Sequence, residues 1–148
     1  VFMDVDHLKQ INDQHGHPVG DAVLAGVVRH LDLHLRTQDK VFRYGGDEFL
    51  VALSGADLTT AHEVVSRVRL GLAAKFLITG PVGSAMQVTA SFGLALLDPD
   101  EDVSESIGRA DQALLLAKTA GRNRAVAWDA SVTTGTRWRL IDVSERSE

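Results

Sequence analysis

Two strand-like runs separated by a pair of glycines constrain the fold of this chain more than any other feature. The runs cover residues 41–44 and 47–53, and Gly45 and Gly46 lie between them. A two-residue connection of this kind predicts a β-hairpin in which both glycines take positive φ. Since a hairpin joins antiparallel strands, a sheet that contains it cannot be entirely parallel.

Hydrophobic periodicity predicts the other elements. Apolar residues at three- and four-residue spacing predict amphipathic helices over residues 21–37, 58–74 and 103–120. Strands are expected over residues 1–3, 86–96 and 124–128, and turn-forming residues fill 79–84. The order strand, helix, hairpin, helix, strand, helix, strand predicts an α+β fold with a mixed, largely antiparallel central sheet flanked by helices.

Length and charge limit the classes of protein. The 148 residues contain no cysteine and carry a formal net charge of −5, which excludes disulfides and Cys-ligated zinc and disfavours DNA as a partner. No apolar run approaches the ~18 residues of a membrane span, so we expect a cytoplasmic segment without membrane contact. Residues 1–128 are expected to form one domain, and the polar residues 129–148 a mobile extension or linker.

Two acidic clusters are the strongest chemical signal. Asp4 and Asp6 follow the first strand, and Asp47 and Glu48 follow the glycine pair. If these strands are neighbours, the carboxylates converge with no cation nearby in the sequence to neutralise them, and such a cluster needs a metal. Oxygen-only ligation favours Mg²⁺ or Mn²⁺. Acids near turns are also commonly solvated, and for Asp6 both interpretations stay open.

Residues 43–49, Arg-Tyr-Gly-Gly-Asp-Glu-Phe, resemble the signature of the GGDEF family, the bacterial diguanylate cyclases. Further stretches resemble the other motifs of this family in the same order, namely residues 4–13, 16–21, 91–93, 109–111 and 117–123. The resemblance runs from residue 1 to about residue 128 and lacks the family's N-terminal motif segment. It implies a fold like the nucleotidyl cyclase core and the polymerase palm, with a ferredoxin-like βαββαβ core.

The implied reaction joins two GTP molecules into cyclic di-GMP and releases two pyrophosphates. By the resemblance, Asp4, Asp47 and the main-chain carbonyl of Val5 coordinate metal ions, two Mg²⁺ or Mn²⁺ per active site, and Glu48 is also needed at this centre. One ion would lower the pKa of the attacking 3′-hydroxyl, and the other would neutralise the triphosphate.

The same resemblance assigns substrate-binding residues. Asn12 and Asp21 match the positions that read guanine, although Asp21 could instead cap its helix. Lys9, Lys118 and Arg122 match phosphate-binding positions.

The geometry of two of these features depends on the local backbone. Lys118 and Arg122 point the same way only if their helix continues through Gly121; otherwise Arg122 arrives from a C-terminal cap. Gly45 and Gly46, without Cβ atoms, would let a phosphate lie against the backbone.

Arg36 and Asp39 resemble the family's RxxD inhibitory site, at which the product binds, and Arg67 matches a secondary contact to the same ligand. The resemblance implies a homodimer, with an upstream sensor domain; residues 41–53 are similar to cyclases coupled to haem-globin sensors. One alternative is a catalytically inactive receptor for GTP or cyclic di-GMP. Another is a purely structural dimerisation module.

Overall fold

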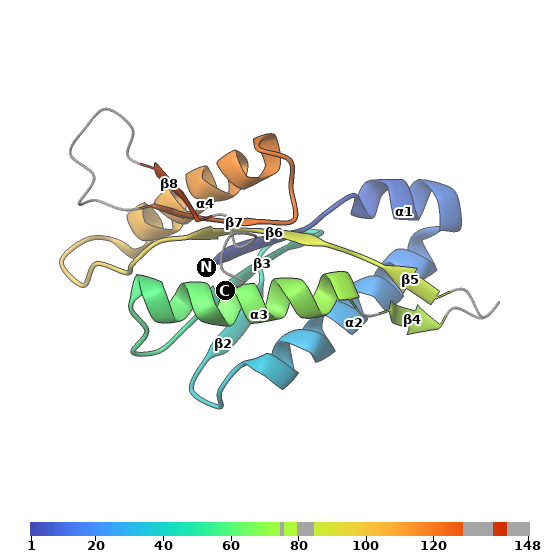
Figure 1. Ribbon diagram of the computed structural model, residues 1–148, viewed down its shortest axis with the longest axis horizontal. Helices are drawn as coiled ribbons and strands as arrows, with labels where there is room; N and C mark the ends of the chain where they lie inside the picture. The colour runs from blue at the N-terminus through green and yellow to red at the C-terminus, as the bar shows by residue number, and fades with distance from the viewer. Residues whose placement is uncertain (75, 80–84, 129–137, 142–148) are drawn as a thin grey trace, which may run out of the picture.

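The hairpin around the glycine pair lies at one edge of a six-stranded sheet with the order β2-β3-β1-β6-β7-β8 (Figure 1). This computed structural model describes residues 1–74, 76–79, 85–128 and 138–141. The elements are, in chain order, β1 (Phe2–Val5), α1 (Leu8–His15), α2 (His17–His34), β2 (Lys40–Arg43), β3 (Glu48–Ala52), α3 (Leu58–Ala74), β4 (Phe76–Thr79), β5 (Ala85–Gln87), β6 (Ala90–Leu94), α4 (Val103–Thr119), β7 (Ala125–Trp128) and β8 (Trp138–Ile141).

Strand β1 lies at the centre of the sheet and pairs antiparallel with both β3 and β6. Strands β2 and β3 are also antiparallel, whereas β6 and β7 are parallel. The order β2-β3-β1-β6, with helices in the two crossovers, is that of a ferredoxin-like βαββαβ core. The predicted α+β class with a mixed, largely antiparallel sheet is therefore confirmed.

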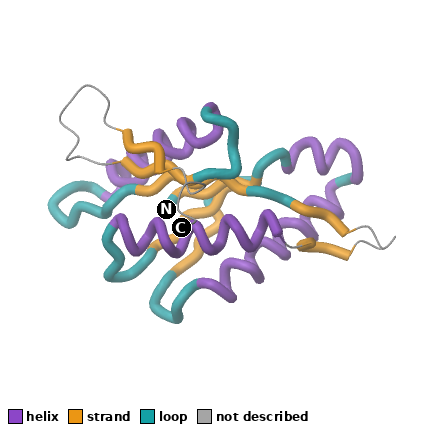
Figure 2. Tube along the Cα trace, viewed as in Figure 1, coloured by secondary structure: helices purple, strands orange, loops and turns teal. Residues whose placement is uncertain are grey.

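Helices cover both faces of the sheet, with α2 and α3 on one side and α4 on the other (Figure 2). Alternate residues of β1 therefore enter different cores. Met3 packs with Phe49 and Phe92 in the core beside α2 and α3, and Phe2 packs with Leu114 of α4. This burial on both faces explains why the chain opens with consecutive apolar residues.

The first two helices differ from the expected ones. Helix α1 was not predicted, because its sequence is polar and only Leu8 is buried. Helix α2 begins at His17, four residues before the expected start, and ends at His34 rather than near Thr37. Gly16, with φ 86°, separates the two helices, and a proline in the first turn of α2 suits a helix start.

Two predictions about the strands and their connections also need correction. The strand expected over 86–96 is interrupted, because β5 pairs with the unpredicted β4 and β6 joins the main sheet. Residues 80–84 of the expected turn lie outside the described residues. The β2–β3 connection spans residues 44–47, and neither Gly45 nor Gly46 has positive φ. Four residues bridge the strands, so the strained two-residue turn is not needed.

The segment 129–148, expected to be an extension or linker, contains one described element. Residues 138–141 form β8, which pairs antiparallel with β7. The remainder of that segment lies outside the described residues. No helix in the part of the chain that the structure describes is long and apolar enough to cross a membrane.

Helix α4 lies so close to β6 that position 93 accepts only glycine. A Cβ on Gly93 would overlap the carbonyl oxygen of Ala110 and the backbone of Leu114.

Since backbone atoms cannot move aside as a side chain does, Gly93→Ala should lower the free energy of unfolding by about 3 kcal/mol or more. Gly108→Ala, on α4 with open space around it, is the matched control and should stabilise by up to ~1 kcal/mol. Urea denaturation of both variants tests this, and equal stabilities would contradict it.

Candidate functional site

Strand pairing brings the two acidic clusters together at the end of β1. Asp4 is the register partner of Glu48 on β3, and the N–H of Val5 donates to the carbonyl of Asp47 at 3.1 Å. Both arrangements follow from β1 being the neighbour of β3. The apolar strands on either side hold these acidic residues at one edge of the core.

Asp4 is buried, with 6% of its surface exposed, and it is paired with a cation. Lys118 Nζ, from the last turn of α4, lies 2.8 Å from its Oδ2. Burial raises the pKa of Asp4, the Lys118 ammonium opposes that shift, and the charges of Asp47 and Asp6 add to it. One cation, supplied by a distant part of the chain, therefore pairs with Asp4, and it does not neutralise all the carboxylates of the cluster.

Asp6 is neither solvated nor free. It is 3% exposed, its Oδ1 accepts from Ser91 Oγ at 2.7 Å, and its Oδ2 accepts from Thr89 Oγ1 at 2.7 Å. The N–H of Asn123 also donates to Oδ2, at 3.1 Å. Since both oxygens accept hydrogen bonds from the protein, the solvated interpretation is wrong and a structural role is favoured.

The turn between β2 and β3 is tied to both strands. The backbone N–H groups of Tyr44 and Gly45 donate to the carbonyl of Glu48, and the Arg43 guanidinium donates to the carbonyls of Gly45 and Gly46 at 3.3 and 2.8 Å. A Cβ on Gly45 would come within 2.8 Å of Glu48 Oε2, whereas one on Gly46 would have nothing within 4 Å. Gly45 therefore makes room for the Glu48 carboxylate, and Gly46 leaves an open backbone surface.

The described residues contain no group of three or more His, Cys, Asp or Glu side chains arranged to hold a metal ion. The donor set of Asp4, Asp47 and Glu48 nevertheless fits Mg²⁺, which proteins commonly bind through one or two carboxylates and which completes its shell with water and substrate phosphates. Burial raises the pKa of Asp4, so its charged form is disfavoured there and a further cation would stabilise it. The residues present therefore suit a cation shared with a phosphate ligand.

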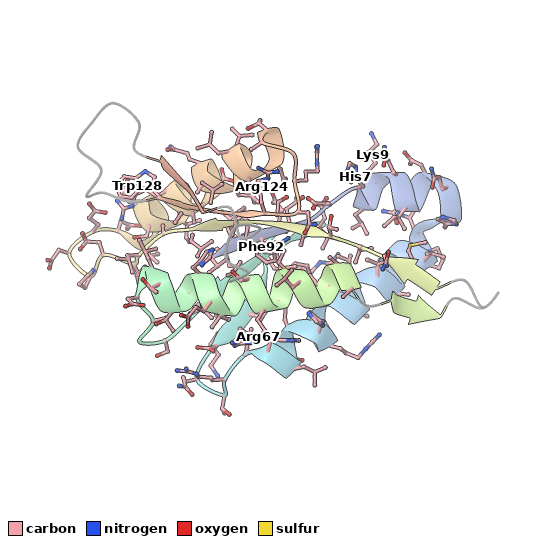
Figure 3. The ribbon with its side chains drawn as sticks, in the orientation of Figure 1. His7, Lys9, Arg67, Phe92, Arg124 and Trp128 are labelled. Carbon is pink, nitrogen blue, oxygen red and sulfur yellow. The ribbon has the colours of Figure 1, made fainter. Side chains whose placement is uncertain are left out.

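Lys118, one of the predicted phosphate-binding residues, lies against Asp4. Lys9 is exposed in the first turn of α1, next to His7 and just beyond β1 (Figure 3). Helix α4 ends at Thr119 and Arg122 has φ 61°, so Arg122 arrives from a C-terminal cap rather than from a continuing helix. Its side chain is exposed.

Asn12 and Asp21 lie on the packed pair α1 and α2. Asn12 Oδ1 is buried and has no hydrogen-bond partner among the described residues, and a Cβ on Gly20 would overlap it. Gly20 belongs to the motif at residues 16–21, but no site role was predicted for it. Asp21 lies inside α2, four residues after its start, and is exposed; the capping interpretation was therefore wrong.

The predicted inhibitory residues lie elsewhere. Asp39 Oδ2 accepts from the Arg36 N–H at 2.9 Å and Oδ1 from the Ser54 N–H at 3.0 Å, which shapes the turn after α2. Arg36 and Asp39 line a groove of about 480 Å³. Arg67 does not line this groove. Its Nη2 donates to the carbonyl of His34, the last residue of α2, at 3.4 Å, and it lies on the face of the sheet that α2 and α3 cover (Figure 3).

The raised pKa of Asp4 has a consequence for stability without metal. Its ordinary value is 3.8, and a higher value in the folded state means that folding favours the protonated carboxyl. The stability it contributes is present at low pH and is lost as the pH rises through the folded-state pKa. Asp4→Asn, which resembles the protonated form, should therefore be more stable than the original protein at pH 7 and not at pH 3. Thermal unfolding in EDTA at both values measures this; a less stable variant at pH 7 would contradict it.

Comparisons with known proteins identify the family. The sequence profile described as diguanylate cyclase, GGDEF domain, matches residues 1–124. Diguanylate cyclase DosC of Escherichia coli strain K12 is 38% identical over 136 residues, which cover 89% of this chain and 28% of that protein. Diguanylate cyclase DgcP of Pseudomonas aeruginosa is 38% identical over 125 residues, covering 84% of this chain and 18% of that protein. The chain thus spans less than a third of either relative.

Solved structures agree. The GGDEF domain of DgcB from Caulobacter crescentus, in complex with c-di-GMP, superposes with a TM-score of 0.80 at 29% identity, over 85% of this chain and 74% of that one. Diguanylate cyclase SiaD from Pseudomonas aeruginosa, in complex with its activator SiaC, gives a TM-score of 0.80 at 40% identity, over 85% and 48%. With its fold, its motifs and its profile match in agreement, this chain belongs to the GGDEF domain family of diguanylate cyclases.

Proposed function

We propose that this domain condenses two GTP molecules into cyclic di-GMP and releases two pyrophosphates. The observation that supports it most is the β1–β3 register, which sets Asp4 opposite Glu48 and binds Val5 to Asp47 beside an open glycine turn. Relatives named diguanylate cyclase, and a neighbour solved with c-di-GMP, support the same reaction.

The carboxylates of Asp4, Asp47 and Glu48, with the carbonyl of Val5, would hold Mg²⁺ or Mn²⁺, two ions per site. Such ions lower the pKa of the attacking ribose 3′-hydroxyl and neutralise the triphosphate. The protein's own task is then to place the two reacting groups in line, since phosphoryl transfer requires positioning and charge stabilisation rather than a protein nucleophile.

Phosphate binding falls to side chains around the end of β1. Lys9, in the first turn of α1, and Arg122, in the turn after α4, are exposed cations, and Lys118 already lies against Asp4. Their charge offsets that of the triphosphate. Gly46, with open space around its Cα, lets a phosphate lie against the backbone, and Gly45 leaves room for Glu48.

Guanine recognition falls to α1 and α2. The carboxylate of Asp21 can accept from guanine N1–H and the 2-amino group, and Asn12 offers an amide held against Gly20. The buried Asn12 Oδ1, which has no partner in the part of the chain that the structure describes, supports this assignment, because a ligand donor would satisfy it.

The product requires two copies of the domain. Each site would hold one GTP, and cyclic di-GMP is two-fold symmetric, so the active species is a homodimer whose two sites face each other. An upstream sensor domain, of the haem-globin type or another, would control this assembly. We place the protein in the cytoplasm, where GTP is available.

The groove beside Arg36 and Asp39 would bind cyclic di-GMP as an inhibitor. Arg36 is exposed at its rim, and a guanidinium pairs well with phosphate and with the Hoogsteen edge of guanine. Arg67, which lies outside the groove, would contribute only after moving.

Incubation of the dimeric protein with GTP and Mg²⁺ or Mn²⁺, followed by chromatography, should yield cyclic di-GMP. Glu48→Gln removes one charge from the catalytic centre and should lower the rate by about a hundredfold or more. Glu63→Gln, an exposed acid on α3, is the matched control and should retain the rate. Tight GTP or cyclic di-GMP binding without any product would support the inactive receptor instead, and no nucleotide binding at all would support the structural dimerisation module.

Arg36→Met should raise the cyclic di-GMP concentration for half-inhibition by about tenfold or more, because the ligand loses the hydrogen bonds and the charge of one guanidinium. Arg36 is preferred over Asp39 for this test, since Asp39 also accepts the Ser54 N–H and shapes the turn. Arg29→Met, an exposed arginine on α2, controls for loss of charge. The same half-inhibition concentration in all three proteins would show that the groove is not the inhibitory site.

A further inference from the structure

The turn after α4, residues 120–124, carries Arg122 in an unusual backbone conformation. Arg122 has φ 61° and Asn123 has φ 46°, directly after Gly121 at φ 119°. Left-handed values are unfavourable for residues with a Cβ, and they persist only where the surroundings hold the chain in place. The neighbours of Asn123 show how this turn is held.

Asp6, directly after strand β1, binds the backbone of Asn123 on one side. The Asn123 N–H donates to Asp6 Oδ2 at 3.1 Å. Asp6 is itself immobile, because Ser91 and Thr89 donate to its two oxygens. A buried carboxylate that accepts a backbone N–H forms a stronger hydrogen bond than a neutral acceptor.

Arg69 of helix α3 binds Asn123 from the other side. Arg69 Nη1 donates to the carbonyl oxygen of Asn123 at 3.1 Å and to its side-chain Oδ1 at 3.2 Å. Arg69 is 9% exposed, in contrast to Arg67 two positions earlier, which is exposed. Helix α3 and helix α4 cover opposite faces of the sheet (Figure 1). Arg69 therefore links helix α3 to the turn that follows helix α4.

The same turn fixes the position of the Arg122 backbone. The Arg122 N–H donates to the carbonyl of Ala117 at 3.0 Å, and Arg124 Nε donates to the carbonyl of Arg122 at 3.1 Å. With its backbone fixed, the Arg122 side chain leaves the turn at the same end of α4 as Lys118, which lies on Asp4.

We propose that Arg69 is a positioning residue for nucleotide binding: with Asp6, it holds Asn123 and thereby directs Arg122 at the triphosphate. The inference rests on the proposed function, in which Arg122 binds phosphate. Arg69 is buried and contacts no ligand; it lowers the cost of ordering a long, exposed side chain when the nucleotide binds.

A double-mutant cycle in the dimeric protein tests the link, with KM and kcat for GTP as the readouts. Arg69→Met should raise KM about tenfold, with a smaller effect on kcat. In an Arg122→Met background the same change should alter KM less than about twofold, because the guanidinium that Arg69 positions is then absent. An equal effect in both backgrounds would overturn the proposal. Arg29→Met is the charge-matched control.

Hydrogen exchange without nucleotide separates this inference from the proposed function. Amides of residues 122–124 should exchange faster in Arg69→Met than in Arg29→Met, whether or not the protein makes cyclic di-GMP. Unchanged exchange would overturn the proposal even in an active enzyme. A wild-type protein that makes no product, with the exchange result as expected, would instead count against the proposed function.

Asn123→Gly keeps the proposal testable if Arg69→Met does not fold. Glycine adopts φ 46° without strain, so the free energy of unfolding should not fall. The variant loses the Oδ1 contact to Arg69 and gains backbone freedom, and KM for GTP should rise about threefold. A KM equal to that of the original protein would contradict the positioning role.

Discussion

Two buried carboxylates at the end of the central strand are the constraint on which the rest of the site depends. Asp4 lies in β1 and Asp6 directly after it, and both are buried. A buried charge is tolerated only with a partner. Each is compensated by a different part of the chain: Lys118 of α4 pairs with Asp4, and β6 with the turn after α4 supplies donors to Asp6. The end of α4 is thereby fixed to β1, and the cations proposed to bind phosphate come with it.

The two carboxylates also differ in their remaining capacity to bind a ligand. Asp6 accepts hydrogen bonds on both oxygens and acts as a structural anchor. Asp4 has one ammonium partner, and burial raises its pKa, so an added cation would relieve an unfavourable charge. One strand end therefore holds both an anchor and a site suited to a ligand. The close packing of Gly93 against α4 serves the same end, since it sets the distance between that helix and the sheet.

Much of this could be predicted from the sequence, and the failures have physical causes. The apolar periodicity of α3 and α4 and the two strand-like runs around the glycine pair are strong local patterns, and they predicted the fold class. Helix α1 is polar, so nothing in its periodicity indicated it. Gly45 was expected to provide positive φ, but the space it leaves is needed by Glu48. That requirement arises only when the turn meets the next strand.

The sequence by itself determined helices α2, α3 and α4, the strands of the main sheet other than β8, their order and the family motifs, because hydrophobic period and residue type act within a few positions along the chain. Only the tertiary structure decided which charges meet. Lys118 and Asp4 are far apart in sequence, as are Arg69 and Asn123, and their pairing depends on how helices pack on the sheet. Likewise Arg67 and Arg69 are indistinguishable as residues on one helix, yet burial makes the second a tie between distant elements. Packing determines burial, and burial determines which polar groups need partners.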